Sequence, residues 1–205
     1  MTIALVDYGA GNVPSVERAV QKLGSTTRRV TQPEELSAAR AIILPGVGHY
    51  AAIIRALDTQ NIRTALLEAI SRGVPFLGIC LGLQALYASS EEAPALSGLG
   101  VLDGAVKSLP STVKLPHMGW NRVRVVKESP LLAGLNSSGY FYFAHTFAVT
   151  STPADAVATC DHGTSFAAVL QRHNIFATQF HPEKSGAAGA RLLKNFLELA
   201  ARQHL

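Results

Sequence analysis

The sequence predicts a single α/β domain over residues 1–205, with a sheet that begins parallel, ends mixed and is flanked by helices. Two observations lead to this fold class. In the first half, short apolar runs alternate with helical patterns, which is typical of parallel strands joined by crossover helices. In the second half, apolar runs follow one another across short turns, which is typical of antiparallel strands. No linker, repeat or low-complexity segment separates the two halves, so one domain is the simplest interpretation.

The elements of the first half follow from apolar spacing and from residues that start or stop helices. Strands are expected at the short apolar runs of residues 3–6 and 41–44 and at the strand-like residues 26–30. Helices are expected where apolar residues recur every three or four positions, at residues 13–23, 50–57 and 62–72. Asn12 is a candidate N-cap, Gly24 and Gly73 follow helix ends, and Pro33 opens a further short helix.

The second half contains a series of predicted strands and a closing helix. The strands are apolar runs at residues 121–126, 140–144, 147–150, 156–160, 166–170 and 175–180. Residues 171–174 are the expected hairpin connection between the last two strands. Apolar residues at helical spacing then predict a helix over residues 191–202.

Composition narrows the class of protein. The chain is 48% hydrophobic and 16% charged, which is typical of a globular protein. Its net charge is +4, but the basic residues are scattered, so no nucleic-acid partner is expected. Cys80 and Cys160 form no disulfide framework, and no signal-peptide or membrane-span pattern occurs, so we expect a cytoplasmic protein without a membrane partner. No Cys/His spacing indicates a zinc site, and no metal or cofactor is expected.

The strongest chemical signal surrounds Cys80. An apolar run at residues 74–79 predicts a buried strand that leads into this cysteine, and a helix is expected over residues 81–88. Gly78 and Gly82 flank the cysteine, so the chain can make the tight strand-to-helix turn of a nucleophile elbow. Such a turn favours a thiolate at the helix start and aims the next backbone N–H at a developing oxyanion. The alternative is a buried, unreactive cysteine, which is the commoner fate of this residue type.

A cysteine nucleophile needs a base, and His181 is the best placed of the seven histidines. It follows an apolar strand, and Pro182 indicates that the strand ends there. In an extended chain, residues two apart face the same side at roughly 6.5–7 Å, so Glu183 can reach one ring nitrogen while the other faces a thiol. The alternative is a surface histidine beside a surface glutamate.

Two rival chemistries fit parts of the sequence. An α/β-hydrolase orders its nucleophile, acid and histidine along the chain, but here the best acid, Glu183, follows His181. A nucleotide-binding fold would explain residues 46–51, which follow a strand and match G-x-G-x-x-A. However, the acidic residue expected about 20 positions later is missing, because Glu68 lies in a helical pattern. We favour a third interpretation, in which this turn cradles an oxyanion or a substrate carboxylate.

Taken together, these motifs resemble the class I (triad) glutamine amidotransferases over nearly the whole chain, and among them the members that work in histidine biosynthesis. The motifs are DYGAGN at 7–12, LPGVG at 44–48, GICLGLQ at 78–84, PHMGWN at 116–121, YFAHT at 142–146 and FHPEKS at 180–185. The cysteine and His-Pro-Glu motifs belong to the whole class, which implies a flavodoxin-like α/β fold. Leu83 stands where methionine is usual, a near-isosteric departure that affects no catalytic group.

The resemblance implies hydrolysis of L-glutamine to glutamate and ammonia without a cofactor. Cys80 would attack the side-chain amide and form a thioester, His181 would protonate ammonia and then activate water, and Glu183 would orient the histidine. Oxyanion and glutamine-binding roles are implied for Gly46, Val47, Gly48, Leu81, Gln84, Glu92, His145, Thr146 and Phe147. The alternatives are solvated side chains for the glutamine and glutamate of this set, and an ordinary buried position for the histidine.

The resemblance also implies a partner, a separate (β/α)8-barrel cyclase subunit that receives the ammonia. Candidate docking residues are those that flank the inferred site: Asn12, Met118, Trp120 and Lys184. For Trp120 the alternative is ordinary core packing. A different class of function also stays open, in which the chain is a catalytically weak subunit that binds and shapes its partner. Glutamine turnover with and without the partner distinguishes the two.

Overall fold

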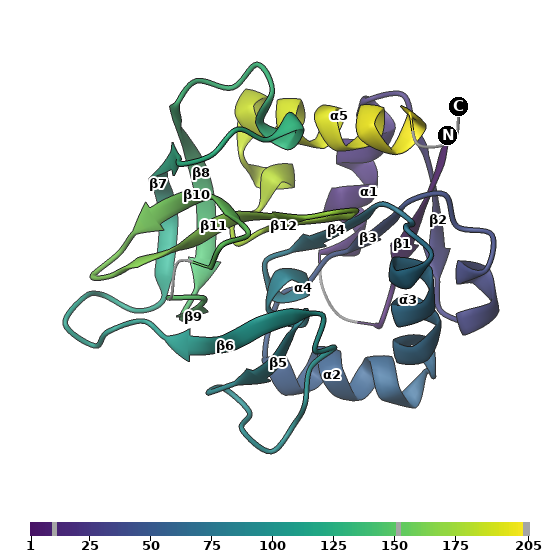
Figure 1. The fold of residues 1–205 in the computed structure, drawn as a ribbon, viewed down its shortest axis with the longest axis horizontal. Helices are drawn as coiled ribbons and strands as arrows, with labels where there is room; N and C mark the ends of the chain where they lie inside the picture. Colours follow the sequence, from purple (N-terminus) through teal and green to yellow (C-terminus); the bar gives the residue numbers. More distant parts are fainter. Residues whose placement is uncertain (10–11, 151–152, 203–205) are drawn as a thin grey trace.

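The computed structural model describes residues 1–9, 12–150 and 153–202, and these residues form a large sheet, a small sheet and flanking helices (Figure 1). The large sheet has nine strands among these residues, in the order β2-β1-β3-β4-β12-β11-β10-β7-β8. Their bounds are β1 (Thr2–Val6), β2 (Thr26–Val30), β3 (Ile42–Leu44), β4 (Phe76–Ile79), β7 (His117–Val125), β8 (Ser138–His145), β10 (Ala156–Asp161), β11 (Ser165–Arg172) and β12 (Ile175–Thr178).

The direction of pairing changes once across the large sheet. The neighbours from β2 to β12 run parallel, and those from β12 to β8 run antiparallel. The expected change from a parallel to a mixed sheet is therefore confirmed. Strand β4 lies between β3 and β12, well inside the parallel part, so its carboxyl end opens onto the edge where sites in open α/β sheets are found.

Helices cover both faces of the sheet. Alternate residues of β1 point to opposite faces, so Ile3 packs in the core beneath α1 and α5, and Ala4 packs in the core beneath α2 and α3. The helices are α1 (Val13–Lys22), α2 (Tyr50–Thr59), α3 (Ile62–Ser71), α4 (Leu81–Gln84) and α5 (Gly186–Arg202), with 3-10 turns η1 (Pro33–Leu36), η2 (Pro130–Leu132) and η3 (Pro182–Lys184). Among the residues described here, no helix is long and apolar enough to cross a membrane.

The predicted helix over residues 81–88 is wrong. Helix α4 ends at Gln84, and strand β5 (Tyr87–Ser90) begins three residues later. The backbone carbonyls that would continue the helix are used elsewhere, because that of Ala85 accepts from the Leu99 N–H and that of Leu86 accepts from the Val101 N–H. Tertiary pairing thus overrides the local helical spacing of apolar residues.

The small sheet was also not predicted. It joins β5, β6 (Leu102–Ser108) and β9 (Phe147–Ala148) below the carboxyl end of the parallel strands (Figure 1). Strand β6 escapes notice because Asp103 and Gly104 interrupt its apolar pattern. Other boundaries shift by a few residues: β12 ends at 178, β7 begins at 117, β9 ends at 148 and α5 begins at 186.

Candidate active site

Cys80 occupies the sharp turn between β4 and α4, with a φ of 53° and a ψ of −103°. A positive φ is strained for a residue other than glycine and costs about 1–3 kcal/mol, so the surroundings must hold it in place. The Cys80 N–H donates to the Thr178 carbonyl of β12 at 2.7 Å, and the Cys80 carbonyl accepts from the Gln84 N–H at 3.1 Å. The turn is therefore fixed both to the centre of the sheet and to the helix that follows.

Close packing explains the glycines around this turn. A Cβ atom on Gly78 would lie 2.7 Å from the Gly82 carbonyl oxygen, and a Cβ atom on Gly82 would overlap the Leu44 carbonyl oxygen. Gly46 is equally crowded, because its Cβ atom would lie 2.6 Å from the Leu81 Cβ. The loop after β3 and the cysteine turn pack backbone against backbone, and only glycine leaves room for that contact.

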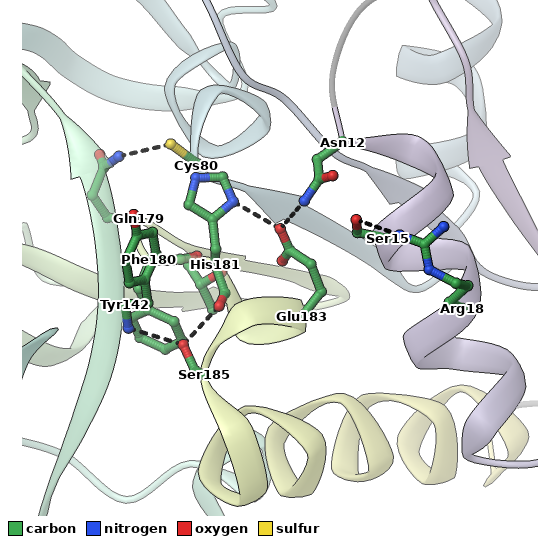
Figure 2. Close-up of polar contacts among 11 residues, drawn as sticks. Asn12, Ser15, Arg18, Cys80, Tyr142, Gln179, Phe180, His181, Glu183 and Ser185 are labelled. Carbon is green, nitrogen blue, oxygen red and sulfur yellow. Dashed lines mark hydrogen bonds and ion pairs between the residues drawn. The ribbon is translucent and has the colours of Figure 1, made fainter. Parts of the chain in front are cut away.

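His181 and Glu183 form a buried pair just after β12 (Figure 2). Nδ1 of His181 donates to Oε1 of Glu183 at 2.9 Å, and the two side chains are 1% and 0% exposed. The expected extended geometry is wrong, because Pro182 opens the 3-10 turn η3 and this turn brings the carboxylate back to the ring. The other ring nitrogen, Nε2, lies on the side of Cys80 (Figure 2) and has no hydrogen-bond partner within the described ranges.

Asn12 holds the same carboxylate from the start of α1. Its Nδ2 donates to Oε1 of Glu183 at 2.9 Å (Figure 2). Asn12 is the N-cap of α1, as predicted, and it caps through its carbonyl, which accepts from the N–H groups of Ser15 and Val16, while its side chain makes no cap hydrogen bond. The side chain is free to face Glu183 because the backbone does the capping. Two donors therefore converge on one carboxylate oxygen.

The charges of this group reinforce one another. Burial, the largest influence, lowers the pKa of His181, but the nearby Cys80 sulfur and the hydrogen bond and charge of Glu183 outweigh it and raise the pKa to about 10. Burial raises the pKa of Glu183, but the hydrogen bonds from His181 and Asn12 and the charge of the ring leave it below its ordinary value. The ring and the carboxyl group thus favour an imidazolium and a carboxylate side by side, which places a proton donor next to the Cys80 sulfur.

A small cleft of about 40 Å³ opens beside the sulfur. Apart from Cys80 and Ala144, its lining consists of residues predicted for oxyanion or glutamine binding: Val47, Gly48, Leu81, Gln84, Glu92, His145, Thr146 and Phe147. Gly46 is the one predicted member outside the lining, and it packs behind Leu81. Ligand pockets usually measure about 300 Å³ or more, so this cleft must widen before it can hold a glutamine.

Two cleft residues have structural contacts of their own. Gln84 is 3% exposed, and its Nε2 donates to the Phe147 carbonyl at 2.8 Å, so the alternative of a solvated side chain is wrong for it. Glu92 is half-buried, and its Oε2 accepts from the Tyr50 N–H at 2.8 Å, at the start of α2. Glu92 thereby ties the small sheet to the loop that carries Gly48. Its role in binding glutamine stays a prediction.

His145 belongs to a chain of neutral, buried rings. Its Nδ1 donates to the Phe147 carbonyl at 2.9 Å, which leaves Nε2 to accept from Nδ1 of His117 at 3.0 Å. Nε2 of His117 in turn accepts from Nδ2 of Asn121 at 3.1 Å. Burial lowers the pKa of His117 to about 4 and that of His145 to about 3. His145 is therefore a satisfied core histidine whose contribution to the cleft comes from its backbone and its fixed ring.

Three of the four candidate docking residues lie on β7 and η3, whereas Asn12 lies at the start of α1. Met118 is 65% exposed and Trp120 is 56% exposed, so the alternative of core packing is wrong for Trp120. The Trp120 ring meets the Tyr142 ring edge-on, with centroids 6.3 Å apart, and Nζ of Lys184 lies 5.7 Å from the Tyr142 ring centroid. Tyr142 was not predicted, although its place opposite Trp120 in the hairpin register brings the two rings together.

Three further residues around the site were assigned no role from the sequence. Ser185 Oγ accepts from the Tyr142 N–H and donates to the His181 carbonyl, which ties η3 to β8 (Figure 2). Gln179 directs its side-chain amide at Cys80, and Tyr8 has a buried hydroxyl without a hydrogen-bond partner. Only tertiary structure reveals these contacts. Within the parts of the chain that the structure describes, no group of His, Cys, Asp and Glu side chains is arranged to hold a metal ion.

Comparison with known proteins gives consistent matches. The family model described as glutamine amidotransferase class-I matches residues 4–200. The chain is 44% identical over 198 residues to imidazole glycerol phosphate synthase subunit HisH of Moorella thermoacetica, a match that covers 96% of this chain and 94% of that protein. It is also 44% identical over 197 residues to the subunit of the same name from Methanothermobacter thermautotrophicus, covering 96% and 98%. A crystal structure of a glutamine amidotransferase superposes with a TM-score of 0.78 at 22% identity, over 97% of this chain and 98% of that one, which shows the fold.

Proposed function

This chain belongs to the class-I glutamine amidotransferase family, and we propose that it releases ammonia from L-glutamine with Cys80, His181 and Glu183 as its catalytic residues. It is the glutaminase subunit of imidazole glycerol phosphate synthase, an enzyme of histidine biosynthesis. One observation carries the catalytic proposal: a buried imidazole is fixed by a carboxylate on one nitrogen and faces a cysteine in a strained turn on the other.

The first half of the reaction forms a thioester. The Cys80 thiolate attacks the side-chain amide carbon of glutamine, and the carbonyl oxygen becomes an oxyanion. The Leu81 N–H donates to this oxyanion, and the Val47 N–H is the second donor once it turns into the cleft. When the tetrahedral intermediate collapses, His181 Nε2–H protonates the departing nitrogen, so ammonia leaves and the carbon–nitrogen bond is broken.

The second half restores the enzyme. His181, now neutral, takes a proton from water, and the resulting hydroxide attacks the thioester carbon. Collapse of the second tetrahedral intermediate releases glutamate and returns the thiolate and the imidazolium. Glu183 keeps Nδ1 protonated throughout, so Nε2 alone exchanges protons with the substrate. Gln84, Glu92 and the backbone of residues 145–147 are the groups available to hold the glutamine.

The ammonia goes to a partner subunit. The names of the relatives imply a synthase with more than one subunit, and we propose that the other is a (β/α)8-barrel cyclase. The docking surface comprises the exposed Met118 and Trp120 on β7 with Lys184 beside them, and Asn12 lies behind at the triad. Trp120→Ala should weaken binding of the cyclase in titration calorimetry, whereas Val126→Ala, an exposed apolar residue past the other end of β7, should not.

The test of catalysis distinguishes the role of the Cys80 thiol in releasing ammonia from the role of the chain as a subunit of the synthase. Cys80→Ala should abolish glutamine-dependent synthesis by the two-subunit enzyme but leave synthesis from added ammonium salts unchanged, because the acceptor reaction needs ammonia and not the thiol. Cys160→Ala is the matched control, since Cys160 is buried within β10, and it should retain both activities. Glutamine-dependent synthesis by a folded Cys80→Ala chain would overturn the proposed nucleophile.

A further inference from the structure

A continuous line of buried amides connects the cleft to the sulfur. Gln84 donates through Nε2 to the Phe147 carbonyl at 2.8 Å and to Gln179 Oε1 at 3.3 Å. Gln179 Nε2 then lies 3.6 Å from Cys80 Sγ, in donor geometry (Figure 2). Gln84, Gln179 and Cys80 are 3%, 0% and 4% exposed, so water cannot replace these contacts at low cost.

The direction of this line follows from its fixed end. A backbone carbonyl can only accept, so the nitrogen of the Gln84 amide must face Phe147. That same nitrogen contacts Gln179, which must therefore present its oxygen to Gln84 and its nitrogen to the sulfur. The Phe147 carbonyl thus sets which end of the Gln179 amide Cys80 meets. An N–H at this place favours a thiolate over a thiol, because a thiolate is the stronger acceptor.

The strand that carries Gln179 aims it at the site. The Gln179 N–H donates to the Ala168 carbonyl of β11 at 2.9 Å, which keeps this residue in line with β12. Because side chains alternate along extended chain, Gln179 and His181 face the sulfur while Phe180 points into the core and stacks on Phe141 at 4.1 Å. Figure 2 shows the Gln179 amide and the His181 ring approaching Cys80 from different sides.

We propose that Gln179 is a positioning residue that holds the Cys80 thiolate against His181 and links it, through Gln84, to occupancy of the glutamine cleft. The proposal rests on the proposed function, in which Cys80 is the nucleophile. In the resting chain the sulfur is held between an amide N–H and an imidazole. When glutamine enters and binds Gln84, the hydrogen bond that Gln179 Oε1 accepts from Gln84 is weakened or exchanged. That change alters the strength of the hydrogen bond that Gln179 Nε2 donates to the thiolate.

The experiment compares two variants of Gln179 with a matched control in the two-subunit enzyme. Gln179→Leu keeps the bulk but removes the donor, and Gln179→Glu keeps the shape but presents an acceptor to the sulfur. Gln171→Leu is the control, because Gln171 lies on β11 with its Oε1 facing Ser129 and does not contact the sulfur. Circular dichroism and thermal unfolding establish that each variant is folded.

Two readouts separate positioning from mere packing. The first is the rate at which iodoacetamide alkylates Cys80, measured by mass spectrometry across pH 5–10. Gln179→Leu should move the midpoint of this profile upward by about one to two pH units, since a hydrogen bond to a charged group is worth ~1.5–3 kcal/mol and each unit is ~1.4 kcal/mol. The second is steady-state turnover, in which kcat should fall about 10–100-fold while KM changes less than about threefold. Gln179→Glu should show the larger change in both.

The outcomes are distinct from those that test the proposed function. An unmoved alkylation profile and an unchanged kcat in folded Gln179→Leu overturn the role of Gln179 even if Cys80→Ala is inactive. Should Gln179→Leu fail to fold, the near-isosteric Gln179→Glu decides the matter by the same two readouts. A shifted profile together with glutamine turnover by Cys80→Ala would instead refute the nucleophile and leave the contact between Gln179 and the sulfur standing.

Discussion

Replacing Glu183 with Gln removes a buried charge but keeps the shape of the side chain. Oε1 of Glu183 accepts from both His181 Nδ1 and Asn12 Nδ2, while Oε2 has no hydrogen-bond partner among the described residues. A glutamine can therefore keep its oxygen toward both donors and place its amide nitrogen where Oε2 now lies. The ring stays oriented, and what disappears is the stabilisation of the imidazolium by a negative neighbour.

The size of the effect follows from the kind of hydrogen bond that is lost. A hydrogen bond to a charged group is worth ~1.5–3 kcal/mol and one between neutral groups ~0.5–1.5 kcal/mol, so the difference is about 1–2 kcal/mol. At ~1.4 kcal/mol for each factor of ten, kcat for glutamine hydrolysis should fall about 5–30-fold. That loss is far smaller than the loss in Cys80→Ala, which removes the attacking atom.

The pH profile of kcat gives a second, independent measure of the effect of Glu183→Gln. Glu183 helps to raise the pKa of His181 to about 10, so without its charge the pKa of His181 falls. The imidazolium is present below that pKa and is lost as the pH rises through it, so the alkaline limb of the kcat profile should move to lower pH.

The assay is glutamate release over pH 6–10 with saturating partner subunit. Asn12→Ala is the companion variant, because it removes a neutral donor from the same oxygen and leaves the charge. The double variant with Glu183→Gln should lose less than the two single losses combined, since both act on one contact. A kcat within twofold of the unmodified enzyme with an unmoved alkaline limb would refute a catalytic role for this charge. A loss as large as that of Cys80→Ala would refute the view that shape alone orients the ring.

Three other predictions concern stability, the cleft and the partner. Burial lowers the pKa of His117 to about 4, against about 6.5 for a free histidine. The contribution of its neutral ring to the free energy of unfolding is therefore present above about pH 6.5 and is lost as the pH falls toward 4. Urea unfolding should register a loss of about 2 kcal/mol between pH 7 and pH 5 from this group, and less in His117→Gln; equal losses would contradict a neutral, buried ring. Gly46→Ala places a Cβ 2.6 Å from the Leu81 Cβ and should lower kcat about 100-fold while iodoacetamide still labels Cys80, because the oxyanion donors are displaced and the thiol is not. Glutamine hydrolysis by the isolated chain should be slow and should rise on adding the cyclase with its substrate; the same rate in all mixtures would exclude control by the partner.

The structure agrees best with the sequence-based predictions where the chemistry is local. Gly78 and Gly82 indicated a tight turn around Cys80 because a Cβ at either place would collide within the next few residues or with the adjacent strand. The pairing of His181 with Glu183 was predicted from their separation of two residues. The prediction placed them in extended chain, whereas the structure pairs them across a 3-10 turn, which the same separation also suits. The glycine turn at residues 46–51 suggested an oxyanion or carboxylate cradle by itself, but the other cleft residues came from resemblance to a family, because no spacing rule joins that turn to residues 84, 92 and 145–147.

The misses share a physical cause, which is competition from distant partners. Asn12 is the N-cap of α1, as expected, but the contact of its side chain with Glu183, 171 positions away, was not predicted. The helix after Cys80 stops early because residues 99–102 take the carbonyls of Ala85 and Leu86. The aim of Gln179 at the sulfur depends on Gln84, 95 positions away. A single sequence carries no record of such contacts, so local propensity could not reveal them and gave a wrong helix after Cys80.

The proposed catalytic residues and the cleft are in different states of readiness, and we propose that this difference is the basis for control by a partner. Cys80, His181 and Glu183 are assembled, yet the cleft beside them measures only about 40 Å³. Burial raises the pKa of Tyr8 and the nearby backbone of Val47 offsets part of that rise, although the Tyr8 hydroxyl has no hydrogen-bond partner among the described residues. A partner can favour the form in which the Val47 N–H faces the cleft. To do so, it must offset the free-energy difference between the two forms through contacts that it makes with that form only. Since each ~1.4 kcal/mol is a factor of ten, a hundredfold activation needs about 2.8 kcal/mol, the scale of one or two well-placed contacts at a docked surface. Because Gly46 is packed against Leu81, the freedom for this turn lies mainly at Gly48, whose φ of 98° only glycine adopts readily, so Gly48→Ala should change the stimulated rate more than the basal rate.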